Sequence, residues 1–491
     1  MQAMGIEFSI RQISLRCALL IALVCSAGFC SYGDVGVILN DSLDTSVARI
    51  TGSGHSAVYL SRVCPESPVR LRLCRPGEQG SVISNYTNLG EDQSFEWNVV
   101  PFSVYVYGVE DPRNRPLFGT DKIKAALEEQ YRDKYLAAYC YSDSCKTSDK
   151  AEWREMVGAS LSRSFYIFIA ETTVQQDLDF IARFNSLPNQ NHFNGVTHNC
   201  ADFTKAIVDS YFPHAAHRDL LNDFGMTSPK AVARSFTRYA LQHPEMRFRV
   251  LHFSQLPGTI KRSSTPRSGT EQLFQSKKLL VPALFFPGYE LPVFAAASYE
   301  ITGRFDPERE FEDYPTVEAT QISHDIHLAE ELHDKPAAAQ LKADRKEDLA
   351  RFLGSPEEWK SYREDFDSLV AEAVRDQVIP DRKYLDRLLK QFNKTGKPFV
   401  NDRGALWMKV AENGGASDVG LSPSTLFAPG SNPRLAYQLA LAEIEWTLKT
   451  NARHRETMPE FKQDWARLKK ARAQAQDFAA RSADLAEAGN D

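Results

Sequence analysis

The 491-residue sequence has little net charge and only one long hydrophobic run. Its formal net charge is −6, which argues against a nucleic-acid partner because such partners select strongly basic surfaces. Apart from that run, no stretch is apolar enough to cross a bilayer, so we expect no transmembrane segment in the mature chain. Hydrophobic and charged residues occur in ordinary proportions, and the length suits two or three globular domains.

The hydrophobic run lies near the N-terminus and predicts an export signal. Arg11 and Arg16 precede it, the run itself covers residues 17–25, and small residues follow. A run of about a dozen apolar residues is too short to span a bilayer comfortably but matches a cleaved signal peptide. Cleavage after Ala27 or near Gly33 would fit. We therefore expect residues 1–33 to be a signal peptide and the mature protein to be periplasmic or envelope-associated.

Cysteine is scarce in the expected mature chain, and its export would permit disulfide bonds. Cys200 has no nearby partner in the sequence and is the candidate free thiol, unless Cys30 also survives cleavage and makes the count even. The other cysteines form two candidate pairs that would each close a small ring: Cys64 with Cys74 across a hairpin-like turn, and Cys140 with Cys145 across a polar loop.

Cys200 begins a predicted helix. Apolar residues recur at helical spacing through Phe203, Ile207 and Tyr211, and Pro213 ends the run. A cysteine in the first turn of a helix lies where unpaired N–H groups and the helix dipole favour an anion, which raises its thiolate fraction. Cys200 is therefore a candidate nucleophile, with a small buried cysteine that packs the helix onto a sheet as the alternative.

The other half of the candidate site lies in a predicted β-rich region at 34–110. His55 follows a glycine at the start of a predicted strand and is a candidate general base for the thiol. Such a base needs a third polar group to orient it. A hairpin centred near Glu66 would place position 77 opposite His55, so Glu78 is the nearest polar candidate and Gln79 the next. A solvated turn carboxylate is the alternative for Glu78, since a shift of one residue changes the face.

Two short motifs lie at the start of these predicted elements: Gly-His-Ser-Ala-Val-Tyr-Leu at 54–60 and Asn-Cys-Ala-Asp-Phe at 199–203. They resemble the circularly permuted NlpC/P60 group of papain-like proteins, which includes the lecithin retinol acyltransferase-like enzymes. The resemblance covers about 34–225 and implies an α+β fold with a helix packed on an antiparallel sheet. It implies Cys200 as nucleophile and His55 as base, whereas Glu78 matches no motif of the group. The implied function is an exported cysteine hydrolase or acyl-transfer enzyme acting on a cell-wall peptide or a lipid acyl bond.

The separation between His55 and Cys200 is long for this group, and the extra residues fall in a charged segment at 111–163. We interpret this segment as a helical insertion that forms a lid or a surface elaboration. Within it, Ile123, Leu127 and Tyr131 predict a helix over 121–138. Alternation predicts a strand at 102–109, and the core-like apolar pattern at 164–169 predicts another. A further helix should begin at Thr172 or Thr173, with Gln175 as a capping partner.

The rest of the chain predicts a loop-rich connecting region at 226–321 and an α-helical domain at 322–491. The proline-interrupted apolar stretch 279–294 could line a groove near the site or pack the domains together. His324, His327 and Glu331 have ligand-like spacing, but no HExxH motif accompanies them, so we predict neither a metal nor a cofactor. The competing functional hypothesis is a non-catalytic envelope protein on the same scaffold, whose helical domain contacts a partner.

Overall fold

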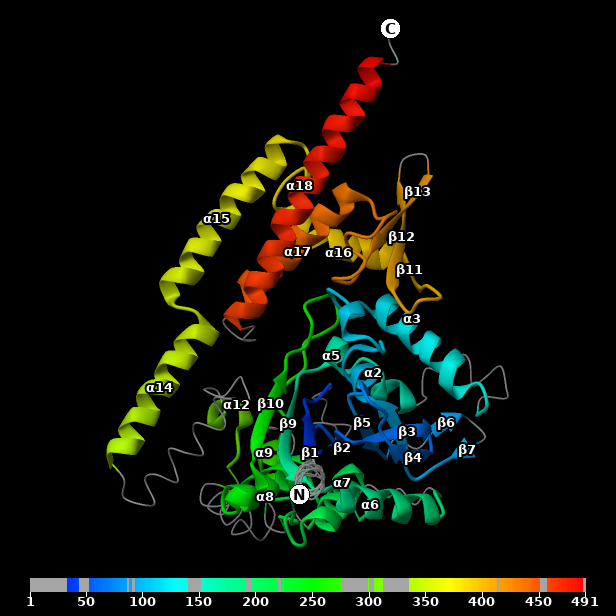
Figure 1. The fold of residues 1–491 in the computed structure, drawn as a ribbon, viewed down its shortest axis with the longest axis vertical. Helices are drawn as coiled ribbons and strands as arrows, with labels where there is room; N and C mark the ends of the chain where they lie inside the picture. The colour runs from blue at the N-terminus through cyan, green and yellow to red at the C-terminus, as the bar shows by residue number, and fades with distance from the viewer. Residues whose placement is uncertain are drawn as a thin grey trace, which may run out of the picture.

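The computed structural model describes most of the chain from Gly33 onward. The described residues are 33–43, 53–85, 88–90, 93–139, 152–190, 194, 197–219, 222–223, 225–275, 299, 304–311, 335–412, 415–450 and 457–488. They form a lower half built on a six-stranded sheet and an upper half that is mainly helical (Figure 1). The α+β class predicted from the sequence is confirmed, and the described helices are too short or too polar to cross a membrane.

The main sheet has the strand order β10-β9-β1-β2-β5-β8, and each neighbouring pair is antiparallel. Its central strands are almost fully buried, because helices cover both faces. The strands are β1 (Gly33–Asn40), β2 (His55–Leu60), β5 (Ser81–Ser84), β8 (Asn98–Pro101), β9 (Phe165–Thr172) and β10 (Arg249–Phe253). Two small hairpins branch from it: β3 (Val63–Ser67) with β4 (Arg70–Leu73), and β6 (Asn88–Gly90) with β7 (Gln93–Ser94).

Side chains of the main sheet alternate between two differently covered faces. One face, which we call the α7 face, carries Val37 and Val58 and packs against α6 (Val174–Ser186), α7 (Cys200–Tyr211) and α8 (Pro229–Leu241). The other, the α2 face, carries Ile38 and Ala57. It packs against α2 (Phe102–Tyr107), α3 (Asp121–Tyr131) and α5 (Ala159–Ser162). Figure 1 shows these two sets of helices on opposite sides of the sheet.

The predicted strand at 102–109 is wrong, because these residues form the short helix α2. Alternating valines and tyrosines suggested a strand with one exposed face, but Ser103, Val104, Tyr105 and Val106 are all buried. Gly108 ends the helix in the left-handed conformation (φ 76°), where its N–H bonds to the Val104 carbonyl. Full burial removed the polar side that would have marked a helical period.

Elsewhere in the lower half, the main predicted elements are present. The strand at 164–169 is β9, and α6 begins after the N-cap Thr173. Its capping-box partner is Gln176 and not Gln175, because the reciprocal bond needs the third helical residue. The helix predicted in the insertion is α3, which starts after the N-cap Thr120 and continues as a short π-helical turn, η2 (Arg132–Leu136). The remaining short helices are η1 (Pro112–Asn114), η3 (Glu152–Met156), η4 (Pro244–Met246), α9 (Gly269–Gln275) and α12 (Pro307–Glu310).

The upper half is mainly helical, as predicted, but it also contains a three-stranded antiparallel sheet that the sequence did not reveal. The strands are β11 (Lys397–Val400), β12 (Leu406–Glu412) and β13 (Gly415–Gly420). The helices are α14 (Lys335–Leu353), α15 (Pro356–Arg375), α16 (Lys383–Thr395), α17 (Pro433–Thr450) and α18 (Met458–Ala488).

The two halves share a continuous apolar core. Leu117 donates its N–H to the Leu421 carbonyl at 2.9 Å, and the Phe118 and Trp446 rings meet edge to face. Helix α3 of the predicted insertion packs against β11. The described part of the insertion thus joins the lower half to the upper half.

The predicted domain boundary at 225 does not coincide with the edge of the main sheet. Helix α8 packs on the α7 face, and β10 pairs with β9 in the register Arg249↔Ile169. The residues of the predicted connecting region therefore contribute an edge strand. Several predictions fall outside the described residues: the signal peptide, the Cys140–Cys145 pair, the apolar stretch 279–294, and the His324 cluster.

Candidate functional site at the start of helix α7

Helix α7 begins at Cys200, as predicted, and its start is fixed by a capping box. The Asn199 side-chain oxygen accepts hydrogen bonds from the N–H groups of Ala201 (2.8 Å) and Asp202 (3.1 Å). The Asp202 carboxylate in turn accepts a hydrogen bond from the Asn199 backbone N–H at 3.3 Å. These bonds satisfy donors that a helix start otherwise leaves open, so they set Cys200 firmly as the first helical residue.

The Cys200 thiol is the free cysteine of the described residues, and it is only partly buried. Its sulfur accepts hydrogen bonds from the backbone N–H and the hydroxyl of Ser56 in β2. The Thr204 hydroxyl donates to the same Ser56 hydroxyl at 3.1 Å. Burial raises the pKa of the Cys200 thiol more than these hydrogen bonds lower it, so the thiol is protonated at neutral pH.

His55 is the first residue of β2, as predicted, and its side chain is 9% exposed. The ring Nε2 lies 2.8 Å from the Ser84 hydroxyl oxygen on β5. Burial, with a smaller contribution from the Arg163 cation, holds the pKa of His55 well below its ordinary value. The imidazole is therefore neutral at physiological pH.

The Cys200 sulfur and the His55 ring lie on opposite faces of the main sheet. Ser56, which contacts the sulfur, pairs with Leu39 on the α7 face. His55 pairs with Asn40, whose side-chain oxygen accepts a 2.9 Å hydrogen bond from the Tyr105 hydroxyl of α2. Because side chains alternate along a strand, the residue next to the thiol in β2 is Ser56, and the imidazole turns toward α2.

Glu78 does not lie beside His55, so the prediction of Glu78 as the orienting group is not supported by the strand register. The sheet partner of β2 is β5, in the register Leu60↔Ser81. Glu78 precedes Ser81 and therefore lies beyond the opposite end of β2 from His55. The hairpin β3–β4 is inserted between the paired strands, which invalidates the assumption of a single hairpin.

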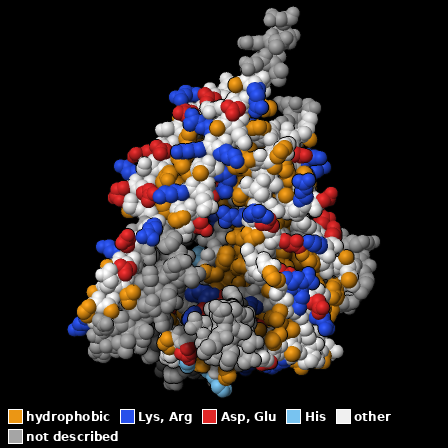
Figure 2. All heavy atoms as spheres, viewed as in Figure 1, with side chains coloured by type: hydrophobic (Ala, Val, Ile, Leu, Met, Phe, Trp, Pro, Cys, Tyr) orange, Lys and Arg blue, Asp and Glu red, His pale blue; other side chains and the backbone are white. Residues whose placement is uncertain are grey.

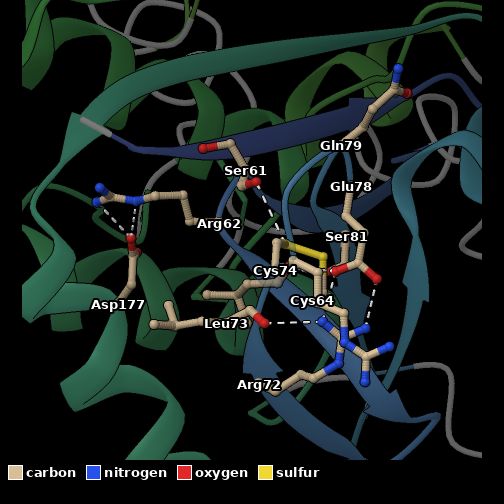
Figure 3. Close-up of a disulfide and its surroundings, with 12 residues drawn as sticks. Ser61, Arg62, Cys64, Arg72, Leu73, Cys74, Glu78, Gln79, Ser81 and Asp177 are labelled. Atoms are coloured by element: carbon tan, nitrogen blue, oxygen red, sulfur yellow. Dashed lines mark hydrogen bonds and ion pairs between the residues drawn. A yellow bond between two sulfur atoms is a disulfide. The ribbon is translucent and has the colours of Figure 1, made fainter. Parts of the chain in front are cut away.

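Glu78 instead forms an ion pair beside a disulfide (Figure 3). Its two carboxylate oxygens each accept a 2.7 Å hydrogen bond from Arg72, and the Arg75 N–H also donates to it. These interactions lower the pKa of Glu78 to about 2. A surface carboxylate in a turn, the alternative interpretation from the sequence, describes this residue.

The disulfide predicted between Cys64 and Cys74 is present and closes the β3–β4 hairpin (Figure 3). Together with Glu78, these sulfurs form a group of potential metal ligands within the described residues. Both sulfurs are consumed by the bond to each other, however, so the group lacks the thiolates that a metal would require.

Sequence reasoning missed the residues that contact the two predicted side chains. The only signal for Ser56 was its position next to His55 in the sequence. Ser84 could not be identified without the β2–β5 register. The other histidines in the described part of this region, His198, His214 and His217, are exposed.

A cavity of about 890 Å³ lies at the end of the main sheet. Leu39, the strand neighbour of Ser56, lines it together with Tyr166 and His252, which follow in the same row across β9 and β10. The His252 and Tyr166 rings are stacked with centroids 4.4 Å apart. Since adjacent strands lie about 4.8 Å apart, the cavity begins roughly one strand away from the residue that holds the sulfur.

The chain was compared with protein-family models, with curated proteins and with solved structures, and no match was found in any of the three.

Proposed function

We propose that this chain is a cysteine hydrolase or acyl-transfer enzyme, exported to the cell envelope, with Cys200 as the nucleophile. The observation that carries the proposal is a partly exposed free thiol at the first position of a capped helix, hydrogen-bonded by the neighbouring strand. The permuted papain-like architecture is part of the proposal. Its support is the antiparallel sheet packed against α7 and the order of the two motifs along the chain.

In the proposed reaction, the Cys200 sulfur attacks the carbonyl carbon of an amide or ester. His55 takes the thiol proton and delivers it to the leaving amine or alcohol as the C–N or C–O bond breaks. Water or another acceptor then releases the acyl group from the sulfur. The Cys200 N–H is the oxyanion donor, because Asn199 already accepts from Ala201 and Asp202. A cell-wall peptide or a lipid acyl bond is the proposed substrate.

The proposal requires a local rearrangement of β2, because the imidazole lies on the α2 face in this structure. A shift by one residue exchanges the faces of His55 and Ser56 and would bring the ring to the sulfur. Gly54, which precedes His55 with a φ of 71°, marks the start of the segment that would move.

The second candidate is a binding protein without catalysis, whose helical half contacts an envelope partner. One specific observation favours it: thiol and imidazole are both neutral and face opposite sides of the sheet.

The pH dependence of Cys200 alkylation by iodoacetamide distinguishes the two candidates. Once β2 has rearranged, the proposed enzyme should react below the range of an ordinary thiol, whose pKa is about 8.5, and His55→Ala should abolish this reaction at low pH. The conformation described here, in which burial raises the pKa of Cys200, should react only above that range. Replacement of the exposed His217 by alanine is the matched control and should leave the profile unchanged. Alkylation that occurs only at alkaline pH and is unaltered by His55→Ala would overturn the catalytic proposal and leave the binding protein.

A further inference from the structure

The cavity at the end of the main sheet lies between the two halves of the molecule. Its walls include the end of the main sheet, Lys230 of α8, the segments 254–257 and 262–267, and Glu443 and Asp464 of α17 and α18. Its volume of about 890 Å³ is in the range of sites that enclose a small organic ligand. Figure 2 shows hydrophobic and basic side chains exposed next to each other in the hollow between the upper and lower halves.

Six carboxylates line the cavity, those of Asp41, Glu271, Asp306, Glu443, Glu460 and Asp464. Three of them are close to cationic partners. Glu271 forms an ion pair with Lys230 at 2.8 Å. Glu443 and Asp464 both contact Arg467, and Arg115 adds a further positive charge nearby. These three acids have cationic partners within the protein, and none of the six carboxylates forms an ion pair with Arg262 or Arg267.

Two arginines of the cavity wall have no carboxylate partner among the described residues. Arg262 donates through one terminal nitrogen to the carbonyls of Gln255 (2.7 Å) and Leu256 (3.1 Å), which hold the guanidinium without neutralising it. The side chain of Arg267 makes no hydrogen bond or ion pair with any part of the chain that the structure describes. A half-buried cation without a counter-charge is costly, and an anion in the cavity would relieve that cost.

The same cavity also offers apolar surface. Leucine and aromatic side chains contribute to its walls on both sides of the sheet end, namely Leu39, Leu117, Phe253, Leu256 and Phe311. A small inorganic anion would leave this surface in contact with water. A ligand with an apolar body would bury it.

We propose that this cavity binds an amphipathic small molecule whose oxyanion head group, a phosphate or a carboxylate, is held by Arg262 and Arg267 while its apolar body contacts the leucine and aromatic walls. Planar guanidinium groups donate paired hydrogen bonds to both kinds of head group. The site does not depend on thiol chemistry at Cys200, so it stands whether or not the chain is an enzyme.

Isothermal titration calorimetry of the full-length chain tests the site with four probes: dihexanoyl phosphatidic acid, hexanoate, inorganic phosphate and uncharged dihexanoylglycerol. At least one of the two amphipathic anions should bind. Inorganic phosphate, which lacks the apolar body, and dihexanoylglycerol, which lacks the anionic head group, should each bind at least about tenfold more weakly. Which amphipathic anion binds tighter identifies the head group.

The variant Arg267→Gln should weaken binding of the amphipathic anion on the order of 10- to 100-fold, because a charge-assisted contact is lost. Its folding should be unaffected, since this side chain makes no bond within the described structure. Arg262→Lys, which keeps the charge but not the planar fork, should also weaken binding. Lys261→Gln removes a neighbouring charge that does not line the cavity and should have no effect.

Three results would overturn the proposal: no binding of either amphipathic anion, equal binding of inorganic phosphate or of dihexanoylglycerol, or unchanged binding in Arg267→Gln with a normal melting temperature. Cys200→Ser should bind the probes as the wild type does, so failure of the catalytic proposal leaves this test intact.

Discussion

The two faces of the main sheet carry different polar groups at the same end of β2. On the α2 face, His55, Ser84, Asn40 and Tyr105 form a buried group of neutral hydrogen-bonding partners. On the α7 face, Ser56 and Thr204 surround a thiol that retains some exposure. Consecutive residues of one strand thus take part in a sealed cluster, in which the Asn40 amide nitrogen lacks a hydrogen-bond partner, and in a partly exposed one.

This difference shows that closeness in sequence and in strand position does not bring two side chains together. The side chains of consecutive strand residues point to opposite faces of the sheet. An imidazole can therefore act as the general base for a thiol only when both groups lie on the same face. On the α7 face, which carries the partly exposed thiol, a separate ionic anchor connects the helices to the sheet. That anchor is a buried ion pair between Arg62, just after β2, and Asp177 of α6, which also accepts a hydrogen bond from Tyr211 of α7.

The largest effect is expected from breaking the anchor of the α7 face. Asp177→Ala should lower the free energy of unfolding by about 3–5 kcal/mol, because it leaves the Arg62 cation buried without its partner. Urea denaturation measures the change. The matched control is Glu66→Ala, which breaks the exposed pair with Arg70 and should cost at most about 1 kcal/mol. Equal losses in both variants would contradict the anchoring role.

A smaller loss is expected on the α2 face, where the contacts are neutral. Ser84→Ala removes the hydroxyl that meets the His55 ring and should lower the free energy of unfolding by about 1–3 kcal/mol, since a buried ring nitrogen loses its partner. The exposed Ser186→Ala should change it by less than about 0.5 kcal/mol. A neutral result for Ser84→Ala would mean that the His55 ring does not depend on this contact.

The two faces should also respond to opposite ends of the pH range. Below about pH 6.5 the unfolded chain takes up a proton at His55 that the folded chain resists, so stability should fall as the pH decreases. Above about pH 8.5 the unfolded chain releases the Cys200 proton that the folded chain retains, so stability should fall as the pH increases. Urea midpoints across the pH range measure both losses.

Single variants assign each of these losses to its residue. His55→Gln should reduce the acid loss and leave the alkaline loss, and Cys200→Ser should do the reverse. An acid loss of the same size in His55→Gln would contradict the assignment of that loss to the sealed cluster on the α2 face.

The smallest effect is expected from the hydroxyl beside the thiol. Ser56→Ala removes one of the hydrogen bonds that lower the pKa of Cys200, so the alkylation profile should move to higher pH. Thr204→Val removes only the donor to Ser56 and should move the profile less. A shift to lower pH in Ser56→Ala would show that this hydroxyl does not stabilise the thiolate.

Local patterns predicted the elements that carry the candidate site. Asn199 and the apolar spacing of Phe203 and Ile207 correctly placed the start of α7, and the glycine before His55 marked the start of β2. The Cys64–Cys74 disulfide followed from ring size and chain geometry. Each of these features is decided within about a dozen residues, which is the range that helix and turn signals cover.

Pairings across longer distances could not be predicted. The β3–β4 hairpin interrupts the path from β2 to its partner β5, so the estimate that selected Glu78 counted along the wrong pair of strands. The face of the sheet toward which His55 points depends on the same register and therefore could not be predicted either. The buried helix α2 and the three strands β11–β13 were missed because their patterns fit another element equally well or were too short to register.

The position of β10 at the sheet edge has a practical consequence for dissecting this protein. A recombinant fragment cut at 225 would lose β10 and leave the backbone of β9, an apolar strand, open for pairing with another copy. Such unprotected edges promote aggregation. A fragment that extends through Gln275 retains β10 and should precipitate less than the shorter one, although it still exposes the apolar core that is shared with the upper half.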